Sequence, residues 1–162
     1  MKKLLISIVL LNFLAACASE KPTEPLAAAP EVVEREPAPA PVVAVDPLDD
    51  PSNILSKRSV YFPFDVSSVQ DSDKPVVQAH AEYLSTNPDR KVRLEGNADE
   101  RGSNEYNLAL GQRRADSVKK MLVLGGANGK QVSTISYGEE KALCSDHQES
   151  CWGQNRRTDI KY

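Results

Sequence analysis

The chain has 162 residues, a formal net charge of −3 and 40% hydrophobic residues, enough for one ordinary domain and an additional segment. The charge is unevenly distributed: residues 18–53 hold eight acidic and two basic side chains, whereas residues 54–162 hold fifteen acidic and sixteen basic ones. A nearly neutral domain lacks the positive field that tracks a phosphate backbone. The composition therefore argues against nucleic acid as a partner.

The first residues predict an exported protein. Lys2 and Lys3 give a positive start, and residues 4–14 form a mostly apolar run. This run is shorter than the roughly 20 apolar residues that a membrane-spanning helix needs, but it has the length of a secretory signal. We therefore expect residues 1–16 to be a signal peptide.

The signal ends in Leu-Ala-Ala-Cys, with the cysteine at position 17. This ending resembles the lipobox of bacterial lipoprotein precursors, which implies cleavage before Cys17, S-diacylglycerol on its sulfur and an acyl group on the new amino terminus. Ala18, in place of an aspartate, implies sorting to the outer membrane, with the folded domain in the periplasm. The alternative is a plain secretory signal that happens to contain a cysteine. Apart from this lipid we expect no cofactor and no metal.

Residues 17–53 are expected to form the lipidated start and a flexible linker. Eight of the eleven prolines lie between positions 18 and 53, mixed with Ala, Val and Glu. Such a composition favours extended chain and cannot form a core, so the folded domain is expected over residues 54–162. We interpret the linker as a passive spacer; a Pro-rich motif for a partner domain is the alternative.

Strand and helix patterns alternate in residues 54–162. The predicted elements are a strand at 59–64, a helix that begins within 71–73 and stops at 87–88, a strand at 91–97, a long helix from 103 to 125, and strands at 132–137 and 157–162. This alternation predicts an α/β two-layer sandwich with the helices packed on one face of a mixed sheet.

Apolar periodicity predicts which side chains form the core. Alternation places Val60, Phe62 and Phe64 on one face of the first strand. The buried side of the long helix is expected to carry five residues at helical spacing: Leu108, Gly111, Ala115, Val118 and Leu122.

Charged residues cluster where the second strand meets the long helix. Residues 95–102 read Glu-Gly-Asn-Ala-Asp-Glu-Arg-Gly, and strand-to-helix turns offer free backbone donors. On the helix, Asn107, Gly111 and Arg114 share one stripe, with the glycine leaving room between two polar side chains. Asp99 could bind an ammonium and Arg114 a carboxylate, which together suit a zwitterion. The alternative is an internal Asp–Arg ion pair with an ordinary helix cap.

Four segments resemble the OmpA-like peptidoglycan-binding domain family. They are Tyr-Phe-Pro-Phe-Asp at 61–65, Gly-Asn-Ala-Asp-Glu-Arg-Gly at 96–102, Tyr-Asn-Leu-Ala-Leu-Gly-Gln-Arg-Arg-Ala at 106–115 and Asn-Arg-Arg at 155–157. Together with the lipobox and the spacer, they are similar to the peptidoglycan-associated lipoproteins of the Tol–Pal system. The resemblance implies a β-α-β-α-β-β core and a role in envelope integrity and cell division.

The resemblance also implies a site and partners. In that family, the residues at the positions of Asp99 and Arg114 bind the diaminopimelate of the peptidoglycan stem peptide. The other implied binding residues are Phe64, Asp65, Ala98, Asn107 and Arg156. The family's protein partner is TolB, a periplasmic β-propeller that competes for an overlapping surface, together with other Tol proteins. A wall-binding lipoprotein of this family outside the Tol–Pal system is the alternative.

Cys144 and Cys151 lie far from Cys17 in a segment that differs from the usual loop of the resembled proteins. In the oxidising periplasm we expect them to form a disulfide. Two free thiols, or a metal pair with His147, are the alternatives.

The sequence favours binding over catalysis. It contains no paired-histidine metal helix, no nucleophile elbow and no phosphate-binding loop. Asp99 and Glu100 could serve as a carboxylate pair for glycan hydrolysis, which makes a lipid-anchored wall hydrolase the rival function. Adjacent residues need not face one pocket, however, so we expect no enzyme.

Overall fold

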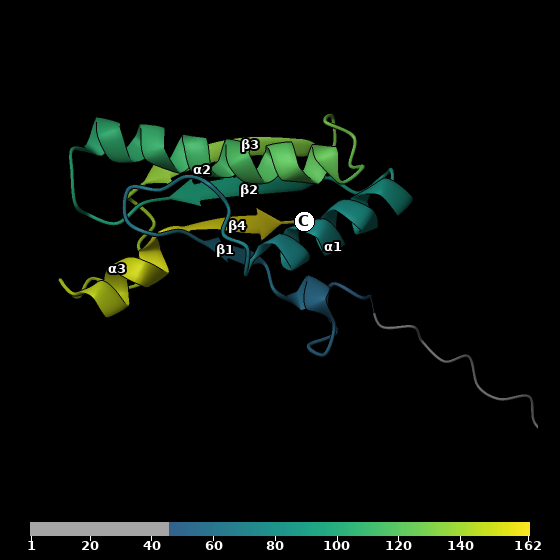
Figure 1. The fold of residues 1–162 in the computed structure, drawn as a ribbon, viewed down its shortest axis with the longest axis horizontal. Coiled ribbons are helices and arrows are strands. Elements are labelled where there is room, and N and C mark those ends of the chain that lie inside the picture. Colours follow the sequence, from purple (N-terminus) through teal and green to yellow (C-terminus); the bar gives the residue numbers. More distant parts are fainter. Residues whose placement is uncertain (1–45) are drawn as a thin grey trace, which may run out of the picture. The chain divides into compact units, whose positions relative to one another are not determined.

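The computed structural model describes residues 46–162, which form one sheet with helices packed against it (Figure 1). The elements in chain order are the 3₁₀ turn η1 (Ile54–Ser56), β1 (Ser59–Tyr61), α1 (Lys74–Thr86), β2 (Val92–Asn97), α2 (Asn104–Leu124), β3 (Val132–Gly138), α3 (Glu149–Asn155) and β4 (Arg157–Lys161). The predicted α/β class and its six main elements are confirmed. The expected signal peptide, Cys17 and most of the linker lie outside the described residues.

The sheet is mixed, with the strand order β1-β4-β2-β3. β4 runs antiparallel to both β1 and β2, whereas β2 and β3 are parallel and are joined through α2. As a result, the end of β2 and the beginning of β4 lie at the same end of the sheet, where Gly96 is paired with Thr158. The loops that leave β2 and enter β4 therefore meet there.

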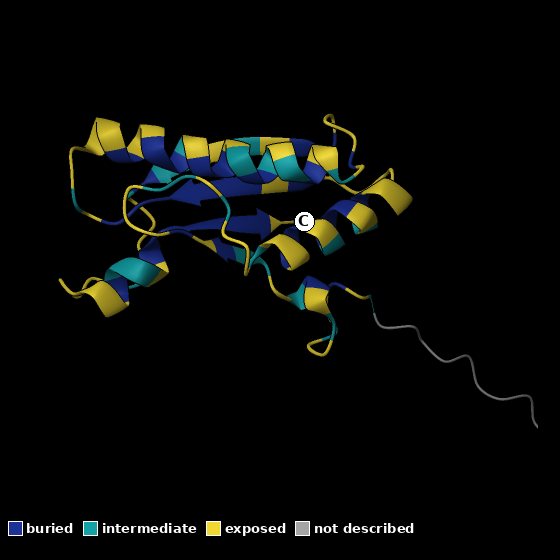
Figure 2. Cartoon of the chain, in the orientation of Figure 1, coloured by how far each residue is buried: buried dark blue, intermediate teal, exposed yellow. Residues whose placement is uncertain are grey.

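The core lies between the sheet and helices α1 and α2. Figure 2 shows buried residues along the sheet side of α2 and exposed ones along its outer side. The central side chains, each buried almost completely, are Val60, Val77, Ala81, Leu84, Leu94, Ala115, Val118, Leu122 and Ile160. Since these contacts are complete within residues 48–160, we expect the part from 46 to 162 to fold on its own.

Ordinary capping rules explain the helix starts. Ser103 precedes α2, and its hydroxyl accepts a hydrogen bond from the backbone N–H of Tyr106 at 3.2 Å. Pro75 stands in the first turn of α1, where its missing N–H has no cost. Asp73 precedes α1 but caps it without a side-chain bond, because its Oδ2 accepts instead from the backbone N–H of Tyr61 at 3.0 Å.

Two core predictions are wrong. β1 ends at Tyr61, because Pro63 has no N–H to continue the ladder, and Phe64 turns outward with 57% of its surface exposed. On α2, Leu108 is 46% exposed and Leu110 is buried in its place. The buried stripe of α2 therefore runs through residue 110, as well as through the predicted residues 111, 115, 118 and 122.

Periodicity did not predict η1 and α3, which are too short to show a repeat. The structure also places part of the expected linker against the domain: Leu48 is buried, and its carbonyl accepts a hydrogen bond from Arg58 Nη2 at 2.6 Å. Between residues 46 and 162, no helix combines the length and the apolar character that crossing a bilayer requires.

Candidate binding site

A pocket opens at the end of the sheet where β2 ends and β4 begins. Its cavity volume is about 230 Å³. The loop after β1, the loop after β2, the first three turns of α2 and the end of α3 supply its walls. The lining residues are Phe64, Asp65, Asp99, Arg101, Gly102, Tyr106, Leu110, Arg114 and Arg156. Five of the seven predicted peptidoglycan-binding residues therefore converge on one cavity.

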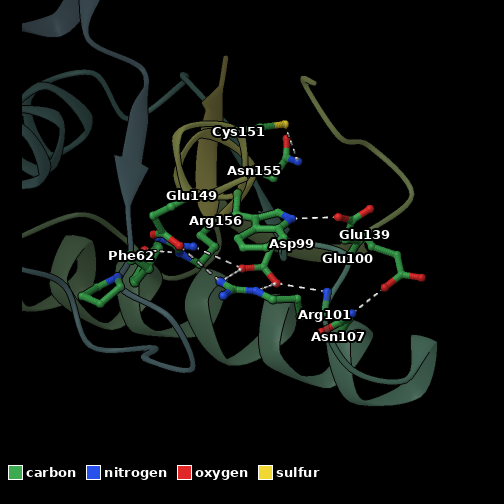
Figure 3. Close-up of polar contacts among 12 residues, drawn as sticks. Phe62, Asp99, Glu100, Arg101, Asn107, Glu139, Glu149, Cys151, Asn155 and Arg156 are labelled. Atoms are coloured by element: carbon green, nitrogen blue, oxygen red, sulfur yellow. Dashed lines mark hydrogen bonds and ion pairs between the residues drawn. The ribbon is translucent and has the colours of Figure 1, made fainter. Parts of the chain in front are cut away.

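Asp99 lies at the base of this pocket and is only 4% exposed. Its Oδ1 accepts from the backbone N–H and Nε of Arg101, and its Oδ2 accepts from Arg101 Nη2 at 2.6 Å and from Arg156 Nη1 at 3.2 Å (Figure 3). Burial alone would raise the pKa of Asp99, but the hydrogen bonds from Arg101 and Arg156 outweigh it and hold the pKa below its usual value. Asp99 is therefore a carboxylate at neutral pH.

Arg114 is entirely buried and does not pair with Asp99 through a hydrogen bond. Its guanidinium donates to three backbone carbonyls, those of Pro63, Val66 and Asn97, at 2.9–3.0 Å. Burial lowers the pKa of Arg114 to about 10, so the group stays a cation at neutral pH. Arg114 thus joins the loop after β1 to the end of β2, and each of its three guanidinium nitrogens donates one hydrogen bond to the frame of the pocket.

Arg101 is a partly exposed cation of this pocket, whereas the sequence assigned the carboxylate-binding role to the buried Arg114. Its side chain is 31% exposed, and its guanidinium lies 4.1 Å from the ring centroids of both Phe64 and Trp152. Nε and Nη2 bind Asp99, while Nη1 has no hydrogen-bond partner among the described residues. The signal was present in the sequence, because Arg101 follows Asp99 by two positions within the motif that carries the family resemblance.

Asp65 supplies a second carboxylate at the rim of the pocket. It is exposed and adopts a left-handed backbone conformation, with φ of 57°, directly after Phe64. Its Oδ1 accepts from the hydroxyl of Tyr106, a residue in the first turn of α2. Tyr106, like Arg101, Gly102 and Leu110, is a lining residue that the sequence argument did not select.

The two arginines of the Asn-Arg-Arg segment point in different directions. Arg156 donates from Nε to the carbonyl of Phe62 at 3.0 Å, from Nη1 to Asp99 and from Nη2 to Glu149. Arg157 is the first residue of β4 and pairs with Asp159 on the same strand at 3.0 Å. Arg156 is therefore the pocket residue of the pair.

Ala98 and Asn107 do not line the cavity. Ala98 is buried, and its N–H donates to the carbonyl of Gly138 at 2.7 Å. Asn107 is buried as well, and its Nδ2 donates to Glu139. Ala98 holds the end of β3 against the loop after β2, and Asn107 holds the loop after β3 against α2, so both support the pocket without lining it.

Gly111 leaves no room for a ligand, contrary to the prediction. A Cβ at this position would lie 2.9 Å from the carbonyl oxygen of Gly96 and 2.3 Å from Ser136 Oγ. The reciprocal Cβ on Gly96 would lie 1.9 Å from the carbonyl oxygen of Gly111. The glycine pair exists because α2 and β2 are in backbone contact, and this contact sets the position of both walls of the pocket.

The structure joins Cys144 and Cys151 in a disulfide, with Cα atoms 5.7 Å apart. His147, within the loop that the disulfide closes, does not approach the sulfurs as a metal pair would. Its Nδ1 lies 2.5 Å from Glu100 Oε1, the same oxygen that accepts from Trp152 Nε1 at 2.7 Å. The disulfide loop is therefore tied to the residue that follows Asp99.

Comparison with known proteins adds independent evidence. Residues 61–156 match the OmpA family. A peptidoglycan-associated lipoprotein from Pasteurella multocida is 48% identical over 105 residues, which cover 65% of this chain and 70% of that protein.

Solved structures agree with this match. The peptidoglycan-associated lipoprotein from Burkholderia pseudomallei superposes with a TM-score of 0.71 at 50% identity, over 72% of this chain and 99% of that one. The periplasmic domain of Helicobacter pylori MotB shares the fold alone, with a TM-score of 0.54 and 20% identity over 63% of this chain and 68% of that one. The chain belongs to the OmpA family and, within it, to the peptidoglycan-associated lipoproteins.

Proposed function

We propose that this protein is an outer-membrane lipoprotein that binds peptidoglycan non-covalently and ties the membrane to the wall. The relatives' names support peptidoglycan association, and the pocket supports a specific ligand group. The free end of diaminopimelate carries an ammonium and a carboxylate. The pocket offers the acids Asp65 and Asp99 beside Arg101, the guanidinium with an uncommitted donor. This pairing of opposite charges at one cavity is the observation that carries the proposal.

Each pocket group has a proposed role. Asp65 and Asp99 bind the ammonium side of the ligand, and Arg101 Nη1 donates to its carboxylate. Arg114 and Arg156 hold the walls in place, because each of their guanidinium nitrogens already donates to a backbone carbonyl or to a neighbouring carboxylate. With two carboxylates and three guanidiniums lining it, the cavity has a charge of +1, which suits a stem peptide with more than one carboxylate.

Sacculus pull-down tests this function. Residues 18–162, without the lipid, are expected to sediment with purified diaminopimelate-containing sacculi, and Arg101→Gln is expected to lose that binding. Lys120→Gln removes an exposed cation of α2 that does not line the pocket, and serves as the control. Sedimentation of Arg101→Gln at the level of Lys120→Gln would show that the cavity is not the wall site.

The rival hydrolase is disfavoured by the state of its two carboxylates. A glycosidase needs an acid with a raised pKa, but hydrogen bonds lower the pKa of both Asp99 and Glu100. Asp99 faces Arg101 and Arg156, whereas Glu100 faces Trp152 and His147. We propose that the protein is no enzyme; release of soluble muropeptides from sacculi by the purified chain would contradict this.

Membership in the Tol–Pal system and attachment through Cys17 are parts of the same proposal. We expect TolB to bind the soluble chain and to be displaced by excess stem peptide, while no binding of TolB would favour a wall-binding lipoprotein outside that system.

Radiolabelled palmitate is expected to label the full precursor, and Cys17→Ser is expected to abolish the label. Labelling that persists in Cys17→Ser would exclude this residue as the lipid site.

A further inference from the structure

Arg101 stacks against two aromatic rings. Its guanidinium carbon lies 4.1 Å from the centroid of Phe64 and 4.1 Å from that of Trp152. An exposed arginine side chain otherwise samples many rotamers, and fixing it costs entropy each time a ligand binds. The two rings restrict the rotamers of Arg101 before a ligand arrives, so less entropy is lost on binding. The geometry of Arg101 therefore depends on the contacts that hold the rings.

Trp152 is itself fixed by a polar contact behind the pocket. Its Nε1 donates to Glu100 Oε1 at 2.7 Å, and His147 Nδ1 approaches the same oxygen at 2.5 Å. Glu100 directly follows Asp99, so the tryptophan is tied to the segment that carries the acid. The position of Trp152 thus couples α3 to the loop after β2.

α3 has only seven residues, too few for a helix that is stable by itself. Two cross-links hold it. The Cys144–Cys151 disulfide joins α3 to the preceding loop. Asn155, at the end of α3, accepts from the N–H of Leu143 at 2.7 Å and donates to the carbonyl of Cys144 at 3.0 Å. Figure 3 shows Cys151 and Asn155 close together, above Arg156 and Asp99 in that view.

We infer that Trp152, held by the disulfide-closed loop, is a positioning residue that clamps Arg101 against Phe64 and so sets the strength of ligand binding in the pocket. The inference deepens the proposed function and rests on it for the identity of the ligand. Trp152 does not line the cavity and acts through Arg101. The disulfide therefore lies outside the pocket yet contributes to its preorganised state.

The main test compares the affinity of variants of residues 18–162 for a synthetic stem peptide that contains diaminopimelate, by calorimetry. Trp152→Ala is expected to raise Kd by about three- to tenfold, which corresponds to about 0.7–1.4 kcal/mol and lies within the range of cation–π contacts. Trp152→Phe keeps a ring without the Glu100 bond and is expected to restore most of the affinity. Tyr137→Ala removes a ring that contacts Lys141 outside the pocket, 3.5 Å from Nζ, and is expected to leave Kd unchanged.

Reduction provides a second arm. Dithiothreitol, which is oxidised to its cyclic disulfide as Cys144 and Cys151 become thiols, is expected to raise Kd of the wild-type chain. The double variant Cys144→Ser with Cys151→Ser is expected to show the raised Kd with or without the reductant. An equal response of both proteins to dithiothreitol would overturn the role of this disulfide.

A ligand-independent readout separates positioning from general stability. In the wild-type chain the Arg101 Nε–H resonance is expected to be protected from exchange by Asp99 and shifted by the two ring currents. In Trp152→Ala the ring-current shift from Trp152 should be lost and the protection should decrease, while the urea midpoint changes little. Unchanged Arg101 resonances in Trp152→Ala would overturn the inference. If the wild-type chain bound no stem peptide, the proposed function would fail, and the Arg101 resonances would still decide whether Trp152 positions it.

Discussion

Arg156 Nη1 lies 3.2 Å from Oδ2 of Asp99, and this ion pair joins the start of β4 to the loop that follows β2. Arg101 Nη2 contacts the same oxygen at 2.6 Å. The side chains of Asp99 and Arg156 are 4% and 7% exposed, so solvent screens their attraction little, and each charge depends on the other to offset its desolvation. One carboxylate therefore organises both the pocket and the junction of the strands.

Asp99→Asn is expected to abolish sacculus binding and to lower the free energy of unfolding. It removes the charge without changing the shape, which leaves the buried Arg156 with the exposed Glu149 as its remaining carboxylate partner. Because one partner remains, the expected loss is about 2–3 kcal/mol, at or below the lower end for breaking a buried pair. Urea unfolding and sacculus pull-down measure the two effects. Asp116→Asn, an exposed acid on α2, is the control. Equal urea midpoints for the two variants would show that the ion pairs of Asp99 with Arg101 and Arg156 do not stabilise the fold.

Arg114→Ala is expected to destabilise the fold and, through it, to lose ligand binding. Three carbonyl groups would lose their donor, and each buried unsatisfied group costs about 1–3 kcal/mol, so a loss of roughly 3 kcal/mol or more is expected. Thermal unfolding followed by circular dichroism gives the value. The neighbouring Arg113→Ala, at an exposed position, should change it by less than about 0.5 kcal/mol. An Arg114→Ala variant that is as stable as the wild-type chain but fails to bind would instead support a direct contact of Arg114 with the ligand's carboxylate.

Gly111→Ala is expected to destabilise the protein by about 1–3 kcal/mol through overpacking against β2. Helix propensity alone predicts the opposite sign, a gain of up to about 1 kcal/mol for alanine inside a helix, so the sign of the change is decisive. Gly129→Ala is the control, because the nearest atom to its added Cβ would be 4.0 Å away. Urea unfolding of both variants measures the effect, and a stabilised Gly111→Ala would disprove the backbone contact between α2 and β2.

The free energy of unfolding is expected to fall as the pH decreases from 7.5 to 5.5, because of His80. This residue is fully buried between the Lys57 carbonyl and the Tyr162 hydroxyl, each 2.9 Å from a ring nitrogen, and burial lowers its pKa below the usual 6.5. With the lower pKa in the folded state, the unfolded chain takes up more protons below about pH 6.5, so acid favours unfolding.

His80→Gln should remove most of this pH dependence in urea unfolding series at several pH values. His147 provides the contrast: Glu100 raises its pKa, so the small stabilisation from this exposed pair is present at low pH and disappears as the pH rises. His147→Gln should therefore leave the loss of stability at low pH in place. If His80→Gln kept the wild-type slope, the titrating group would lie elsewhere.

Much of the fold could be read from local patterns. The alternation in β2 and β4 and the stripe of α2 depend on periods of two and 3.6 residues, which the order of side chains determines by itself. Caps and stops such as Ser103 and Pro75 act within a few residues. These signals could not place Phe64, whose direction depends on where the ladder to β4 ends, or α3, whose seven residues are held by the Cys144–Cys151 disulfide and Asn155.

The sequence by itself determined the family, the α/β class and the segments that build the pocket, because these follow from motifs and local periodicity. Only the tertiary structure decided the partners within the pocket. Charge complementarity predicts that acids meet guanidiniums, but Asp99 had three arginines within reach. The buried position of Arg114 commits it to carbonyls, and the antiparallel approach of β4 brings Arg156 to Asp99. Distances between segments remote in the chain decide which guanidinium nitrogen lacks a hydrogen-bond partner among the described residues, and in this pocket it is Nη1 of Arg101.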